Sequence, residues 1–476
     1  DLNGSIAELK QRGFLDGGED AEIFDKLSLL TKKELLDLPE AGELDRSAKK
    51  AMLLDELADV DAEFSRFEIV RPLHGDILQL YMLLFFGNLN QNFTEFVLND
   101  LGVTPFENYA INGGTSFFRD RHIVDQILTL YDLNEASYAI VEEGDRDSIS
   151  EFVETLPKRS SNPHLARRHD RILNRLARQY ERLGELEGAL HLYNQSQMPP
   201  TRERQARILQ KQGKVQLCTE RCLNIIREPA HDEEYEFALK FLNRHLKKHP
   251  EQSKIPALDF DLLNFKPVVN QITVPNKSLK RVEEMACEWF RSQGQDAFYV
   301  ENSLLSGLFG LAFWDIIFAP VEGAFFNPFQ RGPTDMFTSG FYSSRQELIE
   351  KRMVELQNKQ YLRNTILSCY NKKIPTANYF VNWSWLTPEL IDRFIEMVSP
   401  EALTSIFRRI VIDPSNNRSG FPDLLVFKED DYSLVEIKGP GDRLQNNQLR
   451  WLRHFDSVDI PAEVVHVSFA KAAVTE

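Results

Sequence analysis

The apolar residues recur with a helical period along most of the chain, so the sequence predicts a mostly α-helical protein. Thr31 is followed three residues later by Glu34, the pairing expected of a helix N-cap and its capping-box partner. In the long apolar run near residue 310, Gly307 and Gly310 allow close helix packing. Residues 2–15 are predicted to form a helix followed by a Gly turn, and within residues 24–36 a helix is predicted to start after Thr31. The other predicted helices cover residues 47–57, 77–86, 234–249, 281–293 and 304–318.

The pattern changes near the C-terminal end, where two short apolar runs flank a polar turn at residues 428–433. Two such runs around a turn predict a β-hairpin. Residues i and i+2 of a strand point to the same face, so Glu436 and Lys438 project together. The hairpin can also bring Asp423 alongside them.

Two carboxylates and an ammonium at one end of a small sheet suit metal-assisted hydrolysis of phosphodiesters. Hard divalent ions such as Mg²⁺ bind carboxylate oxygens and keep waters for the reaction. Such an ion polarises the phosphate and activates a water. Lys438 can hold that water or stabilise the developing charge, and the Ile437 carbonyl can supply a further ligand.

Taken alone, a Pro-Asp pair followed at this spacing by Glu-x-Lys is common on solvated faces, and chance explains it. Three further features favour an active site. Val435 and Ile437 make the second strand apolar around the charges, and Gly439-Pro440-Gly441 stops that strand sharply. Gln448 and Trp451 then share one face of the next predicted helix.

The distribution of charge along the chain bears on whether the protein binds DNA. The chain has 476 residues, enough for three or four domains, and a net charge of −16, yet DNA binding needs only a local basic surface. Residues 158–214 hold thirteen Lys and Arg against five Asp and Glu. A solvated helix without a ligand is the alternative, but beside the nuclease-like motif a stripe of one sign favours phosphate contacts. The stripe consists of Arg168, Arg171, Arg175, Arg178 and Arg182.

The same segment repeats itself. Ala177 and Gly184 recur as Ala206 and Gly213, 29 residues later, and the segment resembles tetratricopeptide (TPR) helical hairpins, whose usual period is about 34 residues. Such arrays commonly bind peptides, so a protein partner is the rival function of this segment. Nearer the N-terminus, two short helices with paired lysines resemble a SAP-type DNA-binding module, although a plain helical hairpin fits the same pattern.

Arg418 lies five residues before Asp423 and can contact a phosphate, and a helical connector can present Arg119 and Arg121 to a ligand. The basic residues predicted to contact DNA are Lys32, Lys33, Lys49, Lys50, Arg119, Arg121, Arg168, Arg171, Arg175, Arg178, Arg418 and Arg443.

The four cysteines show no Cys-x-x-Cys spacing, which favours reduced core thiols in a cytosolic protein over a zinc site. No apolar run reaches transmembrane length and no signal peptide is visible, so no membrane partner is expected. Because the chain starts at Asp1 instead of Met, we expect a segment upstream of it to be missing.

Pro422-Asp423, Glu436-Ile437-Lys438-Gly439-Pro440 and Gln448 resemble the PD-(D/E)xK nuclease fold in its VRR-NUC version. Glu301, followed by the run from Leu308 to Phe318, extends the resemblance to the Fanconi-anaemia-associated nuclease family. The resemblance covers nearly the whole chain and is strongest from residue 280 onward. The domain order it implies is a SAP-like module (1–65), a helical connector (66–157), TPR-like repeats with a linker (158–276) and an α/β VRR-NUC nuclease domain (277–476).

The resemblance also implies roles for the residues of the motif. Glu301, Asp423, Glu436 and the Ile437 carbonyl would bind Mg²⁺ or Mn²⁺, although Glu301 taken alone is better explained as a partner of the helix dipole. Lys438 would orient the attacking water. Gln448 would support Lys438 or the phosphate, and all but Ile437 count as catalytic candidates.

The function implied by the resemblance is a structure-specific DNA nuclease of the phosphodiesterase I type. It would act as a 5′-flap endonuclease and 5′-to-3′ exonuclease on branched or flapped DNA, in interstrand-crosslink repair. A bacterial protein would work in the cytoplasm or nucleoid, and a eukaryotic one in the nucleus. Dimerisation on DNA and a protein partner for the repeats are further expectations. The rival functions are a dimeric four-way-junction resolvase of the same fold and a non-catalytic scaffold.

Overall fold

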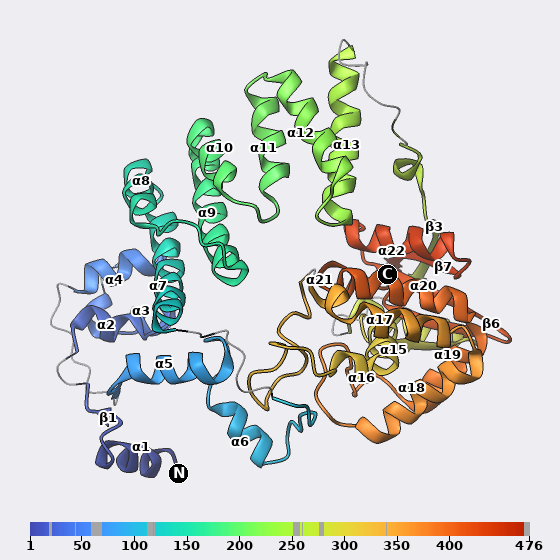
Figure 1. Ribbon diagram of the computed structural model, residues 1–476, viewed down its shortest axis with the longest axis horizontal. Coiled ribbons are helices and arrows are strands. Elements are labelled where there is room, and N and C mark those ends of the chain that lie inside the picture. Colours follow the sequence, from blue (N-terminus) through green and yellow to red (C-terminus); the bar gives the residue numbers. More distant parts are fainter. Residues whose placement is uncertain are drawn as a thin grey trace, which may run out of the picture. The chain divides into compact units, whose positions relative to one another are not determined.

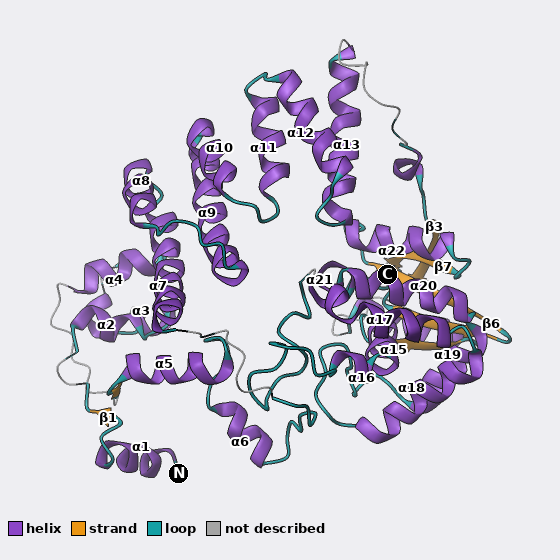
Figure 2. Cartoon of the chain, viewed as in Figure 1, coloured by secondary structure: helices purple, strands orange, loops and turns teal. Residues whose placement is uncertain are grey.

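The computed structural model describes residues 1–18, 21–42, 44–58, 69–111, 118, 120–250, 258, 260–275, 280–338 and 340–470. The chain divides into two compact units, Asp1–Asn92 and Phe93–Glu476. Both are mostly helical, as predicted, and the strands, orange in Figure 2, form one short pair and one five-stranded sheet. Across these described ranges, no helix has both the length and the apolarity needed to cross a membrane.

The N-terminal unit packs short helices around a leucine core that includes the fully buried Leu27, Leu35 and Leu53. The predicted capping box is confirmed, because the Glu34 N–H donates to Thr31 Oγ1 and the Thr31 N–H donates to the Glu34 carboxylate. The elements are α1 (Leu2–Gln11), β1 (Leu15–Asp16), α2 (Ile23–Ser28), α3 (Lys32–Leu36), η1 (Pro39–Ala41), α4 (Lys50–Ala58), β2 (Arg71–Pro72) and α5 (Gly75–Phe86).

From α7 to α13 the second unit forms a succession of helices that pack on their sequence neighbours (Figure 1). The predicted repeats turn back at equivalent glycines, Gly184 after α9 and Gly213 after α11, which have φ angles of 86° and 70°. The assignment of these hairpins as TPR-like stays a prediction. The helices are α6 (Thr94–Asp100), α7 (Arg121–Glu143), α8 (Arg146–Thr155), α9 (Pro163–Leu183), α10 (Leu186–Gln195), α11 (Thr201–Lys211), α12 (Val215–Arg227) and α13 (Asp232–Lys248).

A mixed sheet with strand order β3-β7-β6-β5-β4 forms the centre of the C-terminal part. The predicted hairpin is confirmed, since β5 and β6 pair antiparallel with Leu424 opposite Val435. Its turn is only Glu429 and Asp430, so the polar residues from Asp431 belong to the second strand. The elements are η3 (Asp261–Asn264), β3 (Val268–Val274), α14 (Val282–Ser292), β4 (Asp296–Tyr299), α15 (Leu304–Ala312), α16 (Trp314–Ile317), α17 (Gly340–Glu355), α18 (Lys359–Lys373), α19 (Pro388–Met397), α20 (Pro400–Ile412), α21 (Pro414–Asn417), β5 (Leu424–Lys428), β6 (Asp431–Lys438), α22 (Asn446–Ser457) and β7 (Ala462–Phe469).

Helices cover both faces of this sheet. On one face, Val435 and Ile437 share a core with α14, whereas Leu434 belongs to a larger core with α15 to α20 and α22. Because side chains alternate along a strand, Glu436 and Lys438 face away from α14. The sheet therefore places the charged pair on the side where α22 packs.

The apolar run 304–318 was predicted as one helix, and that prediction is wrong at Phe313. The φ and ψ angles of Phe313 are −115° and 17°, so α15 ends there and α16 begins. Its ring stacks on Phe309 at 5.0 Å, and this aromatic packing outweighs the helical period. Close packing at the glycines is confirmed: a Cβ on Gly310 would lie 2.8 Å from a methyl carbon of Val381.

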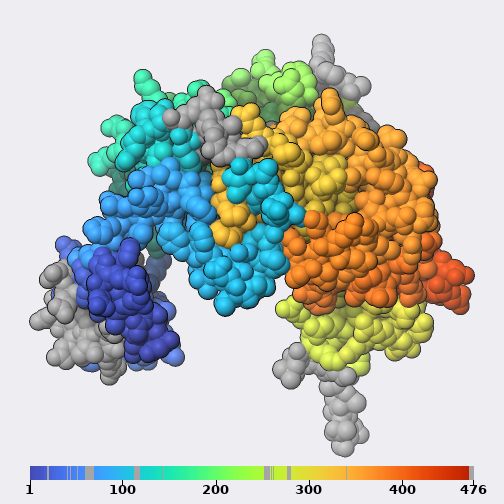
Figure 3. Space-filling view, turned by 60° about the horizontal axis from the view of Figure 1, so that its bottom comes forward, coloured from blue at the N-terminus to red at the C-terminus, as the bar shows by residue number. Residues whose placement is uncertain are grey.

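Residues 93–111 pack against the C-terminal part of their own unit. Tyr109 stacks on Phe325 at 4.0 Å, and the Phe96 ring meets Phe329 edge-on at 4.6 Å. In Figure 3 the blue-to-cyan atoms of this segment lie against gold atoms of the later chain. A piece of the predicted connector is thus part of the core that holds the site, while the boundaries of the four predicted domains stay predictions.

Candidate active site

The prediction that the hairpin gathers Asp423, Glu436 and Lys438 is confirmed. These side chains are only 8%, 1% and 7% exposed. Glu436 Oε1 and Lys438 Nζ form an ion pair at 2.8 Å, and the Ile437 N–H donates to Asp423 Oδ2 at 2.8 Å. Buried charges cost desolvation energy that packing alone does not require, and they cluster at functional sites. This end of the hairpin is therefore the candidate active site.

Gln448, in the first turn of α22, bridges the two members of the ion pair. Its Nε2 donates to Glu436 Oε1 at 2.6 Å, and its Oε1 accepts from Lys438 Nζ at 3.1 Å. The same oxygen accepts the Gln445 N–H at 2.9 Å. An amide is suited to this place because it offers a donor to the acid and an acceptor to the ammonium.

Ion pairs with α13 hold the opposite side of α22. Arg453 donates to Glu236, and Arg450 lies 3.9 Å from the same carboxylate. Nearby, Arg409 of α20 pairs with Asp232 at 2.6 Å. The Arg450–Glu236 pair is buried on both sides, and buried pairs define geometry more than they add net stability. The helix that carries Gln448 is therefore fixed between the sheet and the helical array.

Glu301 lies in the turn between β4 and α15 and is exposed. Its carboxylate accepts hydrogen bonds from the Tyr299 hydroxyl and the Asn302 amide. Asn302, with φ of 50°, also accepts the Gly420 N–H at 2.9 Å, which ties this turn to the segment before the hairpin. Among the residues that the structure describes, no three His, Cys, Asp or Glu side chains are close enough together to hold a metal ion. Membership of Glu301 in a metal site therefore stays a prediction.

The two hairpin carboxyls have unusual electrostatics. Burial raises the pKa of Asp423 and of Glu436, and the Glu301 charge adds to both effects while Lys438 opposes them. Glu436 Oε2 is buried with no hydrogen-bond partner among the described residues, and an unsatisfied buried acceptor costs free energy. A divalent cation would bind this oxygen and favour both charged carboxylates, so the site fits Mg²⁺ or Mn²⁺. Asp423, Glu436 and the Ile437 carbonyl are the residues that would hold it.

We expect Mg²⁺ or Mn²⁺ to raise the thermal stability by a few degrees more at about pH 8 than at about pH 6. The carboxyls must lose their protons to bind metal. In the folded protein both carboxyls have pKa values above their unfolded-state values, so folding favours their protonated forms. In metal-free protein this contribution to stability is present at low pH. It is lost as the pH rises through the folded-state pKa values. Tryptophan fluorescence, with EDTA as the metal-free reference, measures the unfolding. An equal metal effect at both pH values, or one that survives in Glu436→Gln, would contradict this.

Gln448→Leu is expected to lower the single-turnover cleavage rate about tenfold or more. Leucine keeps the volume but removes the hydrogen bonds that hold Glu436 and Lys438. The metal concentration for half-maximal rate should rise as well, because Glu436 becomes less constrained. Gln360→Leu, on the exposed face of α18, is the matched control. A Gln448→Leu enzyme as fast as this control would show that the amide bridge is dispensable.

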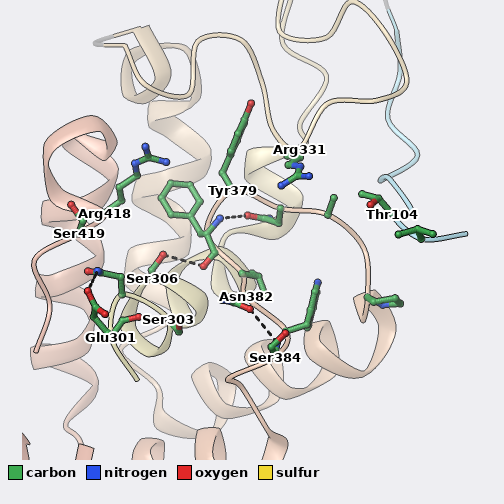
Figure 4. Close-up of a pocket in the computed structure, with 18 residues that line it drawn as sticks. Thr104, Glu301, Ser303, Ser306, Arg331, Tyr379, Asn382, Ser384, Arg418 and Ser419 are labelled. Carbon is green, nitrogen blue, oxygen red and sulfur yellow. Dashed lines mark hydrogen bonds between the residues drawn. The ribbon is translucent and has the colours of Figure 1, made fainter. Parts of the chain in front are cut away.

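A cavity of about 670 Å³ opens beside Glu301 (Figure 4). Arg418 lines it, with its guanidinium 4.4 Å from the centre of the Phe337 ring. The structure thus brings the predicted DNA contact Arg418 to the same cavity as the predicted metal ligand Glu301.

The arginine stripe of α9 divides into two ridges. Arg168 donates to the Tyr131 hydroxyl at 2.7 Å, and Arg175 stacks on a tyrosine ring of the same helix, α7, at 3.5 Å. Arg171 and Arg178 are exposed. Packing of α9 on α7 therefore accounts for two of the five arginines of the stripe, and DNA contact by any of these residues stays a prediction.

The other basic candidates are spread over both units. Lys50 donates to the Ser28 carbonyl at 2.8 Å, and Arg121 pairs with Asp125 at 2.7 Å. Lys32 is half-buried, and Arg119 lies outside the described residues. The exposed ones are Lys33, Lys49, Arg418 and Arg443.

Two residues of the site were not predicted from the sequence. Tyr299 donates to Glu301 from two residues earlier, at the end of β4, and this two-residue spacing is a signal that could have indicated it. Glu236 anchors α22 through Arg453, 217 residues away in the chain. Nothing in the local pattern links those two residues.

Comparison with known proteins agrees with this geometry. Residues 357–469 match the VRR-NUC domain family. The Fanconi-associated nuclease 1 homolog of Pseudomonas aeruginosa is 30% identical over 481 residues, which cover 98% of this chain and 84% of that protein. The Schizosaccharomyces pombe homolog is 34% identical over 195 residues, or 40% of this chain and 27% of that protein.

Solved structures of the same relative also match this chain. A crystal structure of paFAN1 bound to 2-nucleotide 5′-flap DNA with a gap matches with a TM-score of 0.80 and 29% identity, over 99% of this chain and 87% of that chain. The corresponding complex with a 1-nucleotide 5′ flap has a TM-score of 0.78. The likeness extends over the helical part and the sheet together. This chain belongs to the Fanconi-associated nuclease 1 family.

Proposed function

We propose that this protein is a structure-specific DNA nuclease that hydrolyses phosphodiesters of flapped DNA with a divalent metal. The observation that carries the proposal is the buried cluster of Asp423, Glu436, Lys438 and Gln448 at the end of the hairpin. The likeness to paFAN1 bound to 5′-flap DNA supports the substrate class.

The residues of the cluster have distinct tasks. Asp423, Glu436 and the Ile437 carbonyl hold the metal, which when bound polarises the phosphate and activates a water. Lys438, held by Glu436 and Gln448, places its ammonium to orient the attacking water and to stabilise the charge that develops on the phosphate. Glu301 would be a further metal ligand, and the Tyr299 hydroxyl, which donates to its carboxylate, would help to orient it.

The protein binds DNA through contacts to the phosphate backbone. The exposed Arg171 and Arg178, with the exposed lysines of the N-terminal unit, contact phosphates, which makes binding salt-dependent and indifferent to sequence. Selection among DNA structures then comes from shape and deformability. Arg168 and Arg175 serve mainly to hold α9 on α7.

The finer assignments extend the proposal and are supported by the resemblance to the family. They are 5′-flap endonuclease and 5′-to-3′ exonuclease action of the phosphodiesterase I type, with Mg²⁺ or Mn²⁺, in interstrand-crosslink repair. The protein would act in the cytoplasm or nucleoid of a bacterium, or in a eukaryotic nucleus. A dimer on DNA and a protein partner at the helical repeats belong to the same proposal.

The substrate class is tested by cutting end-labelled 5′-flap, 3′-flap, four-way and plain duplex DNA of matched sequence. Preferential cutting of the 5′ flap near its junction is the expected result. Symmetrical paired cuts on the four-way junction would favour a dimeric resolvase instead. Tight binding without any cutting would favour a non-catalytic scaffold.

A further inference from the structure

A second cavity, of about 430 Å³, lies between α14, β4 and the start of α19. This volume is within the range of roughly 300–1,000 Å³ found for ligand sites. Tyr299 and Trp385 line it, and their rings meet edge-on at 5.1 Å. The buried Cys287 and Leu390 add apolar surface. Because the Trp385 side chain is 47% exposed, the cavity offers an aromatic surface to an incoming group.

The cavity borders the outer edge of β4. In the strand order β3-β7-β6-β5-β4 this strand is the last, so its outer edge pairs with no other strand of the described chain. The Val300 N–H donates to the Asp423 carbonyl at 2.8 Å, on the β5 side. Backbone groups alternate between the two edges of a strand, so the N–H and C=O of Tyr299 point to the outer edge. Arg291 already binds the other outward carbonyl, that of Ala297, which leaves Tyr299 as the position where a further strand can pair.

The charge around the cavity is unbalanced. Arg291 is occupied by the Ala297 carbonyl, and Glu288 pairs with Lys280. Glu283 and Glu284 form no ion pair within the described ranges. The charged residues that line the cavity are Arg281, Glu283, Glu284, Glu288 and Arg291. Two unpaired carboxylates against one remaining guanidinium favour a cation in this cavity and disfavour a phosphate.

An open strand edge, an exposed aromatic ring and an excess of negative charge together match an extended peptide with a cationic side chain. Peptides add to open sheet edges through main-chain hydrogen bonds, and pockets for their side chains give specificity. A guanidinium stacks on tryptophan and also pairs with carboxylates. We propose that this cavity binds an extended segment of a partner protein. The backbone of that segment pairs with Tyr299, and an arginine of it enters the cavity against Trp385 and the carboxylates of α14.

This surface belongs to the sheet and not to the helical repeats. The Tyr299 hydroxyl donates to the Glu301 carboxylate, so a bound segment contacts a residue that holds a predicted metal ligand. Partner binding is thereby linked to the active site. The binding itself needs neither DNA nor metal, so its test is independent of the proposed nuclease function.

The probe is a seven-residue peptide of alternating threonine and valine with a central arginine, blocked at both ends. Isothermal titration calorimetry measures its binding to the full chain in about 0.15 M salt, where exposed charges farther apart than about 8 Å are screened. We expect a Kd on the order of 0.1–1 mM, since one residue pair and one cation supply the contact. Trp385→Leu should weaken binding about 3- to 30-fold. Glu284→Lys should weaken it at least about threefold, and a peptide with glutamate in place of arginine should not bind.

The matched control is Glu347→Lys, a charge reversal on the exposed face of α17. A basic peptide is attracted to any chain with a net charge of −16, and this variant measures that general effect. It should bind the peptide like wild type. Equal weakening in Glu347→Lys and Glu284→Lys would overturn the proposal, because the attraction would then not be local.

Two further peptides test the backbone pairing. Each carries N-methyl groups on alternate residues, which removes the N–H groups of one edge. One of them should lose binding and the other should keep it. Hydrogen exchange in residues 296–299 should slow only with the peptides that bind. Equal behaviour of the two methylated peptides, or no binding of the arginine peptide, would contradict pairing at β4.

Discussion

Lys438→Met should lower the single-turnover rate of DNA cleavage by about 100-fold or more. The ammonium lies 2.8 Å from Glu436 Oε1, and Lys438 is only 7% exposed, so no other described cation can replace it without repacking. Methionine fills a similar volume without the charge. Loss of the ammonium also leaves the Glu436 carboxyl without its ion-pair partner. This raises the pKa of that carboxyl further and weakens metal binding.

The matched control for this prediction is Lys428→Met, at the far end of the same hairpin, where the lysine is exposed. Its rate should stay within about twofold of wild type. Binding of the flap in Ca²⁺ should be nearly unchanged in both variants, because one buried lysine adds little to backbone contacts. If Lys438→Met cleaved within tenfold of wild type, the role assigned to the ammonium would be wrong.

Phe309→Ala should destabilise the C-terminal part by about 3–5 kcal/mol. Phe309 is fully buried in α15 and packs on Phe313 at 5.0 Å and on Phe380 at 4.8 Å. Truncation leaves a cavity that these rings cannot fill. Because Glu301 lies in the turn that leads into α15, the same change should reduce cleavage at temperatures near the lowered midpoint.

This effect is measured through tryptophan fluorescence during urea unfolding, since all five tryptophans lie between residues 289 and 451 and so report on the C-terminal part. Leu348→Ala serves as control, because Leu348 is 48% exposed on α17. It should cost less than about 0.5 kcal/mol. Equal losses in the two variants would mean that the aromatic core is not what holds α15.

The hairpin and its charged pair could be predicted from the sequence because they are local. A two-residue spacing places Glu436 and Lys438 on one strand face, and the apolar Val435 and Ile437 identify the opposite face. The capping box at Thr31 is local in the same sense. Each of these features needs only neighbouring residues to be recognised.

Contacts between distant segments could not be predicted. The arginine stripe of α9 is periodic, but the period does not show which of its arginines pack against another helix. In the structure Arg168 and Arg175 pack against α7. The run 304–318 has a helical period, yet packing of the Phe313 ring breaks it into α15 and α16. Arg331 and Arg418 line the same cavity although they are 87 positions apart in the chain, a fact visible only in the fold.

The central claim is that the buried hairpin cluster is a metal-dependent nuclease site. The most direct measurement is cleavage of a labelled 5′-flap substrate by wild type and Asp423→Asn, with Mg²⁺, Mn²⁺ or EDTA. We predict that wild type cuts near the junction with either metal and not with EDTA. Asp423→Asn should bind the flap as tightly but cut it at least about 100-fold more slowly. Cutting that persists in Asp423→Asn or in EDTA would contradict the assignment of the site.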